Sequence, residues 1–417
     1  MDKLQITGKA ILTGSISVSG SKNAALPIMI ASLLSENGLY LKNLPALQDI
    51  LTMKKLLENF GIKIKKINSQ TFFDSTNINN SLADYDLVRK MRASILLLGP
   101  LIARFKKAKI SLPGGCAIGT RPIDIHLNGL EKLGVKFSIE NGFVSADVKK
   151  NLTGAHIKLS FPSVGATENI MMAASKAKGE TIIENAAREP EIEDLAKCLN
   201  KMGAKIAGAG TTKIIIEGVK KLSKSEHTIM SDRIVAGTYV IAAVMLNSEF
   251  IIKKIKPDLL STPLEVLQNM GAKLEIGNDS IKVLPSSGIK GIALKTKPYP
   301  GFPTDLQAQI MALMSVAKGN SQIKEMIFEN RFMHVSELNR LGARIKTKKD
   351  VAYIEGGRSL KGAKVMASDL RASVSLVLAG LYAEGKTTIN RLYHLDRGYE
   401  KIEETLGKCG PIITRLK

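Results

Sequence analysis

The sequence predicts an α/β protein built from six repeated β-α-β-α-β-β units, and three observations lead to this fold class. The first is a helix-end pattern of leucine, two or three residues, glycine and a short apolar strand, which occurs six times. Its glycines lie 68 to 73 residues apart: Gly61, Gly134, Gly203, Gly271, Gly342 and Gly410. Glycine at this place is typical of a helix C-cap in the left-handed region, and the apolar residues after it start the next strand.

The second observation is a common opening sequence. Residues 15–33, 156–175, 292–314 and 364–381 each contain a short strand pattern, a turn of small residues and an amphipathic helix pattern. In each stretch, alternating polarity gives way to apolar residues at helical spacing. We therefore expect each of these stretches to open one unit.

The third observation is an apolar strand that leads through a polar turn to the helix before the repeat glycine. It is present at residues 181–195, 248–267 and 387–406. A solenoid is the competing interpretation of any repeat, but about seventy residues exceeds the usual solenoid period, and the turns differ strongly from unit to unit. We favour a closed two-domain enzyme with three units in each domain and its site where the domains meet.

The formal net charge of +22 raises the question of nucleic-acid binding. The lysines are scattered, tryptophan is absent, and no helix-turn-helix, zinc-finger or ribonucleoprotein signature occurs. A solvated lysine-rich surface explains the charge better, and its positive field would attract a small anionic substrate. Only 14 of the 60 basic residues are arginines. Several stand where a planar, bidentate anion clamp would be useful: Arg92, Arg121, Arg331, Arg371 and Arg397.

Compartment and redox state follow from two negative observations. No stretch approaches the roughly eighteen consecutive apolar residues of a membrane span, and the first residues lack the basic and apolar regions of a signal peptide. We therefore expect a cytoplasmic protein without a membrane partner. The three cysteines, Cys116, Cys198 and Cys409, are odd in number and far apart, which favours neither a disulfide framework nor a metal site.

The most informative motif is LPGGCAIGTRP at residues 112–122. Its glycines let the backbone fold closely around a small anion, and the guanidinium of Arg121 would bind that anion and favour ionisation of the Cys116 thiol. A small hydrophobic residue in a surface turn is the alternative for Cys116. The density of glycine, proline and arginine favours a reactive cysteine beside a phosphate or carboxylate.

Two predicted helix starts carry further candidates. Lys22 and Asn23 follow Ser-Gly-Ser, which is a natural anion site but also an ordinary linker and capping sequence. Asp305 lies at another helix start, where an aspartate is as often a cap as a functional group.

Charged neighbours mark two more turns. Asp369 stands beside Arg371, and Asp396 precedes Arg397. The histidines His126 and His394 could act as acids or bases, but isolated histidines are more often structural.

Together these motifs resemble the UDP-N-acetylglucosamine 1-carboxyvinyltransferases, a family of enolpyruvyl transferases. The matching segments, in order and spacing, are Lys22-Asn23, PGGCAIGTRPIDIHL, FPSVGATENI, ENAAREPEIEDL, FPTDLQAQ, FENRFMHV, SDLRASVSLVLAG and HLDRGYEKIE. The similarity covers residues 3–415, and the cysteine loop with its Arg-Pro-Ile-Asp is its most specific part. The related 3-phosphoshikimate 1-carboxyvinyltransferases share the fold but are not expected to carry this loop.

The resemblance implies a two-domain inverse α/β barrel, with helices inside and sheets outside. Domain I is expected at residues 22–230, and domain II at residues 1–21 with 231–417. The implied reaction transfers the enolpyruvyl group of phosphoenolpyruvate to the 3′-hydroxyl of UDP-N-acetylglucosamine through a tetrahedral ketal and releases phosphate. This is the first committed step of peptidoglycan synthesis, on which cell shape and division depend. No cofactor or metal is implied, and we expect a monomer or weak oligomer.

The resemblance also assigns roles to residues. Lys22, Arg121 and Arg397 are expected to bind phosphate and carboxylate, and Asp305 to act as base on the 3′-hydroxyl. Cys116 would either protonate C3 or assist product release, can form a covalent adduct with the pyruvate donor, and would be the target of fosfomycin. Further substrate contacts are expected from Asn23, Arg92, Pro122, Asp124, Ser163, Val164, Gly165, Ile327, Arg331, Asp369 and Arg371.

One segment departs from the family pattern. Some members carry a lysine just before Ser-Val-Gly, where this chain has Phe161-Pro162-Ser163. Recognition of uracil or diphosphate is therefore expected to rely more on stacking and backbone contacts. Residues 111–121 are expected to form a lid, and the sugar nucleotide to bind first and promote its closure.

Two other functions remain open. Shikimate 3-phosphate could be the acceptor instead, or the chain could be a non-enzymatic paralogue that keeps sugar-nucleotide binding. The second alternative is disfavoured because Lys22, Cys116, Asp305 and Arg397 are all present.

Overall fold

The computed structural model describes residues 2–78, 80, 91–112 and 123–417, which form two compact units. Residues 2–19 and 231–417 make up the terminal unit, and the described residues from 20 to 230 make up the central unit. Each unit has its own hydrophobic core. Each unit therefore packs its own sheets and helices around its own core.

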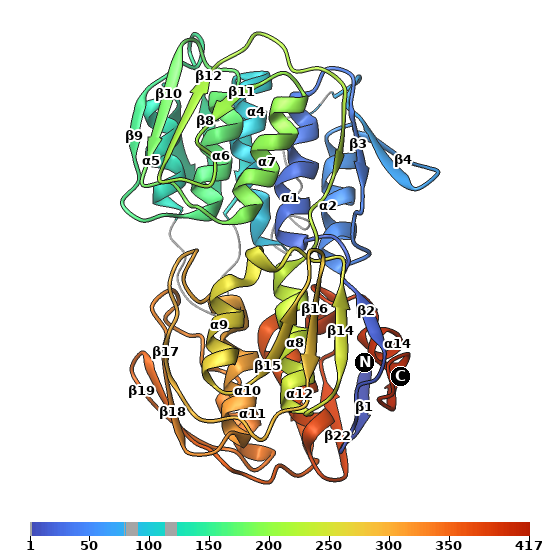
Figure 1. Ribbon diagram of the computed structural model, residues 1–417. Coiled ribbons are helices and arrows are strands. Elements are labelled where there is room, and N and C mark those ends of the chain that lie inside the picture. The colour runs from blue at the N-terminus through green and yellow to red at the C-terminus, as the bar shows by residue number, and fades with distance from the viewer. Residues whose placement is uncertain (1, 79, 81–90, 113–122) are drawn as a thin grey trace. The chain divides into compact units, whose positions relative to one another are not determined.

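Three buried helices form the centre of the terminal unit (Figure 1). They are α8 (Arg233–Met245), α10 (Gln307–Val316) and α12 (Leu370–Tyr382). All of α8 is buried, and α10 and α12 are buried except for their last residues. The three helices pack against one another. Their sequences are apolar on every side, as expected for helices that protein surrounds.

Three four-stranded sheets cover these helices. The first contains, in spatial order, β15 (Lys273–Ile276), β16 (Ser280–Leu284), β14 (Phe250–Lys253) and β2 (Ser15–Ser17). The second contains β17 (Ala293–Lys295), β18 (Asn320–Lys324), β20 (Val351–Glu355) and β19 (Arg344–Lys348). The third contains β21 (Lys364–Met366), β22 (Lys386–Asn390), β1 (Lys3–Thr7) and β23 (Ile413–Leu416). Each sheet packs on a different helix, since α8 contacts β14 and β16, α10 contacts β18 and β20, and α12 contacts β1 and β22.

The central unit repeats this arrangement. Its buried helices are α1 (Lys22–Ala31), α4 (Leu98–Phe105) and α6 (Val164–Ala174). One sheet contains β13 (Ser225–Thr228), β3 (Leu39–Lys42), β5 (Gln70–Asp74) and β4 (Lys63–Ile67). Another contains β11 (Lys205–Ala207), β12 (Lys213–Glu217), β10 (Glu180–Glu184) and β9 (His156–Lys158). The third contains β6 (Lys107–Ser111), β8 (Phe143–Asp147) and β7 (Lys136–Glu140). The predicted fold class, with helices inside and sheets outside, is confirmed in both units.

A second set of helices is amphipathic and lies beside the edge strands. These helices are α2 (Gln48–Asn59), α5 (Asp124–Lys132), α7 (Pro190–Lys201), α9 (Ser261–Asn269), α11 (Val335–Arg340) and α14 (Ile402–Gly407). In α7, for example, Ile192, Leu195 and Leu199 are buried while Lys197 is exposed. This helix contacts both β11 and β13 and so connects two sheets of its unit.

All six repeat glycines adopt the left-handed conformation that the sequence pattern predicts. Their φ angles lie between +95° and +114°. Five of them are the second residue after a helix, whereas Gly410 is the third residue after α14. A side chain at such a φ is strained, so glycine is required where the chain leaves the helix for an edge strand.

One of the predicted repeat openings is divided between the two compact units. In residues 15–33, β2 pairs with β14 in the terminal unit, whereas α1 lies in the central unit. Conversely, β13, which precedes α8, pairs with β3 in the central unit. The chain therefore passes from one unit to the other on either side of residues 20–230, and each first strand joins the sheet of the unit it leaves. Strand pairing follows backbone hydrogen bonds to distant residues, which a local pattern does not contain.

Within the described ranges, no helix is both long and apolar enough to cross a membrane.

Candidate active site

The predicted site residues that the structure describes form two sets, one in each unit. The central set consists of Lys22, Asn23, Asp124, Ser163, Val164 and Gly165, and the terminal set of Asp305, Ile327, Arg331, Asp369, Arg371 and Arg397. Cys116, Arg121 and Pro122 lie outside the described residues, as does most of the expected lid at 111–121. Arg92 begins the short 3-10 helix η2 (Arg92–Leu97).

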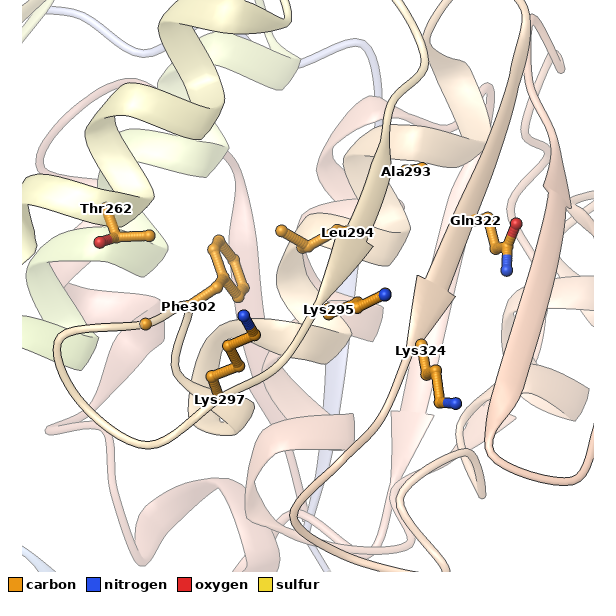
Figure 2. Close-up of a pocket in the computed structure, with 9 residues that line it drawn as sticks. Thr262, Ala293, Leu294, Lys295, Lys297, Phe302, Gln322 and Lys324 are labelled. Carbon is orange, nitrogen blue, oxygen red and sulfur yellow. The ribbon is translucent and has the colours of Figure 1, made fainter.

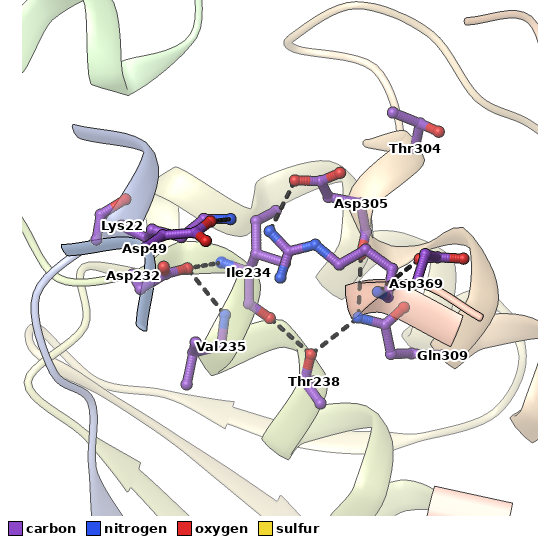
Figure 3. Close-up of polar contacts among 12 residues, drawn as sticks. Lys22, Asp49, Asp232, Ile234, Val235, Thr238, Thr304, Asp305, Gln309 and Asp369 are labelled. Carbon is purple, nitrogen blue, oxygen red and sulfur yellow. Dashed lines mark hydrogen bonds and ion pairs between the residues drawn. The ribbon is translucent and has the colours of Figure 1, made fainter. Parts of the chain in front are cut away.

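Asp305 is the centre of the terminal set (Figure 3). Its Oδ1 accepts a hydrogen bond from Nη2 of Arg331 at 2.8 Å, and its Oδ2 accepts one from Nη2 of Arg371 at 2.8 Å. The arginine side chains are 4% and 5% exposed, but that of Asp305 is 27% exposed. The carboxylate is thus held by two buried arginines while it remains partly exposed.

The capping role considered for Asp305 is not observed. Asp305 lies in η4 (Thr304–Leu306), directly before α10, and neither helix has a side-chain cap hydrogen bond. The two arginines hold the carboxylate instead.

Arg371 remains cationic in this buried position. Burial opposes its charge, but the nearby Asp305, Tyr399 and Asp232 together raise the pKa of the guanidinium above its usual value. The guanidinium therefore keeps its charge, and its hydrogen bond to Asp305 fixes the direction in which the carboxylate points.

The N-terminal ends of the three core helices of the terminal unit meet at Asp305. Asp232 caps α8 by accepting from the backbone N–H groups of Ile234 and Val235, and Asp369 caps α12 by accepting from those of Arg371 and Ala372. Helix N-termini carry partial positive charge, so this end of the unit favours anions. Asp369, expected to contact substrate, also positions the backbone of Arg371.

A buried chain of hydrogen bonds connects these helices, and no role for the side chains that form it was expected from the sequence. Nε2 of Gln309 donates to the backbone oxygen of Asp305 at 3.0 Å and to Oγ1 of Thr238 at 3.1 Å. The Thr238 hydroxyl is also 2.8 Å from the Tyr399 hydroxyl. Gln309, Thr238 and Tyr399 are each at most 2% exposed. Their network ties the position of Asp305 to α8 and to the segment that follows Arg397.

Arg397 lies at the C-terminal end of α13 (Tyr393–Asp396) and is half-buried. Burial, together with the charge of Arg397, lowers the pKa of His394. The sequence suggested that neighbouring Asp396 forms a carboxylate–guanidinium pair with Arg397 at this turn. Instead, both oxygens of Asp396 accept hydrogen bonds from Arg415, at 2.7 and 3.0 Å. Asp396 therefore anchors β23, and only Arg397 of this pair remains a site candidate.

Another buried histidine lies behind Arg331. Burial lowers the pKa of His334 to about 4, Arg331 adds to the effect, and Asp369 opposes it. The ring hydrogen-bonds to the Arg331 backbone, while Nε2 has no partner within the described residues. His334 is thus a neutral support for the arginine that holds Asp305.

Lys22 anchors the central set (Figure 3). It is the first residue of α1, where Ser21 accepts from the backbone N–H of Ala24 and caps the helix. Its ammonium lies 3.4 Å from Oδ2 of Asp49, in the first turn of α2, and the two side chains are 11% and 7% exposed. The carboxylate fixes the direction of the ammonium, and no motif indicated this role for Asp49.

Ser163, Val164 and Gly165 lie at the start of α6, and this helix packs against α5. Ser163 caps α6 by accepting from the N–H of Ala166. A Cβ on Gly165 would lie only 3.1 Å from Cε1 of His126, so glycine allows this close approach. His126 in turn lies 3.2 Å from Nδ2 of Asn169. This histidine therefore connects the helix of Asp124 to the turn at Ser163, where we expect the nucleotide to bind.

Phe161, at the departure from the family pattern, is 41% exposed. Its ring is therefore accessible for stacking.

Burial raises the pKa of Glu168, which lies in α6, well above its usual value, and Glu191 and Glu189 add to the effect.

The two described cysteines are buried. Cys198 and Cys409 are 0% and 4% exposed, and both are free thiols. Burial raises the pKa of each thiol. A thiolate is the reactive form of cysteine, so neither residue competes with Cys116 for the role of reactive thiol.

A cavity of about 530 Å³ in the terminal unit is lined by residues of α9, β17 and β18 and of the segment after β17 (Figure 2). Its lining includes Leu294, Lys295, Lys297, Phe302 and Lys324, but none of the predicted site residues. Within the part of the chain that the structure describes, no cluster of His, Cys, Asp and Glu could hold a metal ion.

Comparisons with known proteins identify the family of the chain. The profile of the EPSP synthase family (3-phosphoshikimate 1-carboxyvinyltransferase) matches residues 6–406. The chain is 52% identical, over the full length of both chains, to the UDP-N-acetylglucosamine 1-carboxyvinyltransferase of Granulibacter bethesdensis, and 52% identical over full length to the enzyme of that name from Chelativorans.

Solved structures share the fold at low sequence identity. The enolpyruvyl transferase NikO from Streptomyces tendae is 24% identical, with a TM-score of 0.90 and coverage of 99% of this chain and 98% of that one. EPSP synthase from Acinetobacter baumannii is 18% identical, with a TM-score of 0.77 over 100% of both chains. The folds of all three are therefore alike.

Proposed function

The chain belongs to the EPSP synthase family of carboxyvinyltransferases, and we propose that it transfers the enolpyruvyl group of phosphoenolpyruvate to the 3′-hydroxyl of UDP-N-acetylglucosamine. Phosphate is the second product, and the reaction is the first committed step of peptidoglycan synthesis. The observation that carries this proposal is the 52% identity to transferases of that name along the entire chain. The geometry around Asp305 supports the same chemistry.

The reaction is an addition followed by an elimination. The sugar hydroxyl attacks C2 of phosphoenolpyruvate and loses its proton to a base, while C3 gains a proton from an acid. The resulting tetrahedral ketal then expels phosphate and loses a proton from C3, which restores the double bond. The protein must therefore supply a base, an acid and cations for the donor.

Asp305 acts as the base on the 3′-hydroxyl. Its position supports this role because two buried arginines hold the carboxylate while it remains partly exposed. Arg331 and Arg371 provide the rigid support that general-base geometry needs.

Cations bind the doubly charged donor. Lys22, Arg121 and Arg397 contact its phosphate and carboxylate, with Arg92, Arg331 and Arg371 adding to the positive potential. The buried carboxylate of Asp49 supports the role of Lys22, because it fixes the ammonium beside the start of α1.

Cys116 acts at C3 or in product release, and both roles need an accessible thiol. Residues 111–121 close over the substrates and keep water from the ketal. The remaining contacts to the sugar nucleotide come from Asn23, Pro122, Asp124, Ser163, Val164, Gly165, Ile327 and Asp369. No cofactor takes part, and the chain acts in the cytoplasm as a monomer or weak oligomer.

A phosphate-release assay with two acceptors tests the proposal. Purified protein and phosphoenolpyruvate are mixed with UDP-N-acetylglucosamine or with shikimate 3-phosphate, the acceptor that the family description suggests. We expect phosphate release only with the sugar nucleotide. Phosphate release only with shikimate 3-phosphate would show that this compound is the acceptor. No phosphate release with either acceptor would contradict the proposal that the chain is a transferase.

A further inference from the structure

Glu325 is a buried carboxylate that connects the Asp305 turn to the segment bearing Ile327 and Arg331. It follows β18 directly and is 4% exposed. Its Oε1 accepts from Oγ1 of Thr296 at 2.9 Å and from the backbone N–H groups of Ile327 and Phe328 at 2.9 and 3.2 Å. Its Oε2 accepts from Oγ1 of Thr304 at 3.0 Å. Four donors therefore converge on one side chain.

The two strands that meet at Glu325 explain why it points inward. Thr296 hydrogen-bonds through its N–H to the oxygen of Lys324 at 3.0 Å, so the ends of β17 and β18 lie side by side. Neighbouring residues in extended chain point to opposite faces. Lys295, Lys297 and Lys324 line the cavity (Figure 2). Thr296 and Glu325, by contrast, are buried.

The contacts close a ring around Asp305. Thr304 donates to Glu325 through its hydroxyl, and its backbone oxygen accepts from Nη2 of Arg331 at 3.3 Å. The same Nη2 donates to Asp305 at 2.8 Å. The chain between Glu325 and Arg331 completes the ring, and it begins with the two N–H groups that Glu325 binds. A shift of either segment would break at least one of these bonds.

We propose that Glu325 is a positioning residue for the transferase reaction, which sets the base Asp305 relative to the sugar-binding segment at Ile327. This proposal rests on the proposed function. The carboxylate is suited to the task because both of its oxygens accept hydrogen bonds and neither needs to donate. Glu325 touches no reacting atom in this scheme and acts only through Thr304 and the backbone of 327–328.

Three variants and a control test the proposal. Glu325→Ala removes all four bonds, Glu325→Gln keeps Oε1 with its three donors, and Thr304→Val removes only the hydroxyl on Oε2. Glu384→Ala is the matched control, because it removes a carboxylate of the same unit whose ion pair with Lys9 is exposed.

Steady-state kinetics separate positioning from general stability. We expect Glu325→Ala to lower kcat/KM for UDP-N-acetylglucosamine about 100-fold, since misplacement by about 1 Å has that effect. The kcat/KM of Glu325→Gln should be at least about tenfold higher than that of Glu325→Ala, and the kcat/KM of Glu384→Ala should equal that of the wild type. Thr304→Val should cost about tenfold in the wild type but nothing further in Glu325→Ala, because the two residues act through one contact.

Hydrogen exchange provides a readout that does not depend on catalysis. The amides of Ile327 and Phe328 should exchange at least about tenfold faster in Glu325→Ala, with the amides of α8 unchanged. Three outcomes would each overturn the proposal. Folded Glu325→Ala could keep the wild-type kcat/KM, Glu325→Ala and Glu325→Gln could lose equal amounts of kcat/KM, or Thr304→Val could lower kcat/KM by the same factor in Glu325→Ala as in the wild type. If the Ala variant does not fold, the Gln and Thr304→Val variants decide the question. Wild-type protein without transferase activity would refute the proposed function instead, and exchange at Ile327 and Phe328 would still test the contact.

Discussion

The ammonium of Lys22 lies 3.4 Å from the carboxylate of Asp49, and both side chains are almost completely buried in the central unit. Lys22 is the first residue of α1, and Asp49 lies in the first turn of α2. A buried cation beside a carboxylate is held in one direction, and removal of one partner leaves the other poorly solvated. The ion pair therefore fixes the direction of the Lys22 ammonium, which we propose binds an anionic substrate.

Substitutions at this pair should weaken use of phosphoenolpyruvate. We expect Lys22→Ala to lower kcat/KM for phosphoenolpyruvate about 1000-fold, because a preorganised cation at the developing negative charge is lost. Asp49→Asn keeps the size of the side chain but not its charge, and should cost about tenfold. Phosphate release at varied phosphoenolpyruvate measures both effects.

The control is the ion pair of Lys9 and Glu384, which is shorter, at 2.7 Å, but whose side chains are 70% and 62% exposed. Exposed pairs contribute little, so Lys9→Ala should leave kcat/KM unchanged. A wild-type rate for Asp49→Asn would show that Lys22 needs no carboxylate to be positioned.

Asp305 should be indispensable for the chemical step. Asp305→Asn keeps an acceptor for one arginine but removes the base, and we expect kcat to fall about 100-fold to 10,000-fold. Affinity for UDP-N-acetylglucosamine, measured by calorimetry, should change much less.

The matched variant is Asp350→Asn, in the same unit, whose carboxylate pairs with Lys324 at 3.4 Å and is 48% exposed. This variant should keep the wild-type kcat. An Asp305→Asn enzyme with a kcat within about threefold of the wild type would mean that another group removes the proton.

The repeat pattern shows how far local sequence determines this fold. Each repeat glycine could be placed because a helix C-cap needs a left-handed residue, a requirement that lies within a few residues of chain. The pairing of β2 with β14 and of β13 with β3 could not be predicted from the local pattern, since Ile16 pairs with Ile252 and His227 with Leu41. The paired residues lie more than 180 residues apart in the sequence, and every repeat contains a similar strand that could serve as the partner.

The site shows the same division. Asp305, Arg331 and Arg371, which the structure brings together, could be named as candidates because their residue types suit the chemistry and each stands in a family motif. Asp49 and Glu325 stand in no motif, and their roles depend on contacts with Lys22 and Thr304 that only the folded chain creates. Residues that position a site thus escape sequence reasoning more readily than residues that perform the chemistry.

Electrophilic labelling should select one thiol. Burial raises the pKa of both Cys198 and Cys409, which keeps these thiols protonated and shielded. We expect intact mass spectrometry after exposure to fosfomycin to show a single adduct, which peptide mapping places at Cys116. Addition of UDP-N-acetylglucosamine should accelerate its formation, because the sugar nucleotide is expected to close the lid.

Cys116→Ser is the control for this experiment and should give no adduct. An adduct at Cys198 or Cys409 in the folded protein would contradict the assignment of the reactive thiol.

His334 should make the stability of the terminal unit depend on pH. Its pKa is about 4 in the folded chain because the ring is buried, whereas an unfolded histidine titrates near pH 6.5. Between these values the unfolded chain binds the proton and the folded chain does not, so stability falls as the pH drops from about 6.5 to about 4, and this contribution is constant below that. From pH 7 to pH 5 the loss is about 2 kcal/mol.

Urea unfolding of the wild type and of His334→Asn at pH 7 and pH 5 tests this effect. Asparagine keeps a donor for the Arg331 backbone but does not titrate, so its stability relative to the wild type should improve by about 2 kcal/mol at the lower pH. His156→Gln, at an exposed histidine whose side chain is 60% accessible, should follow the wild type at both values. If His334→Asn loses stability in parallel with the wild type, another buried group causes the acid sensitivity, and His334 supports Arg331 without reporting on pH.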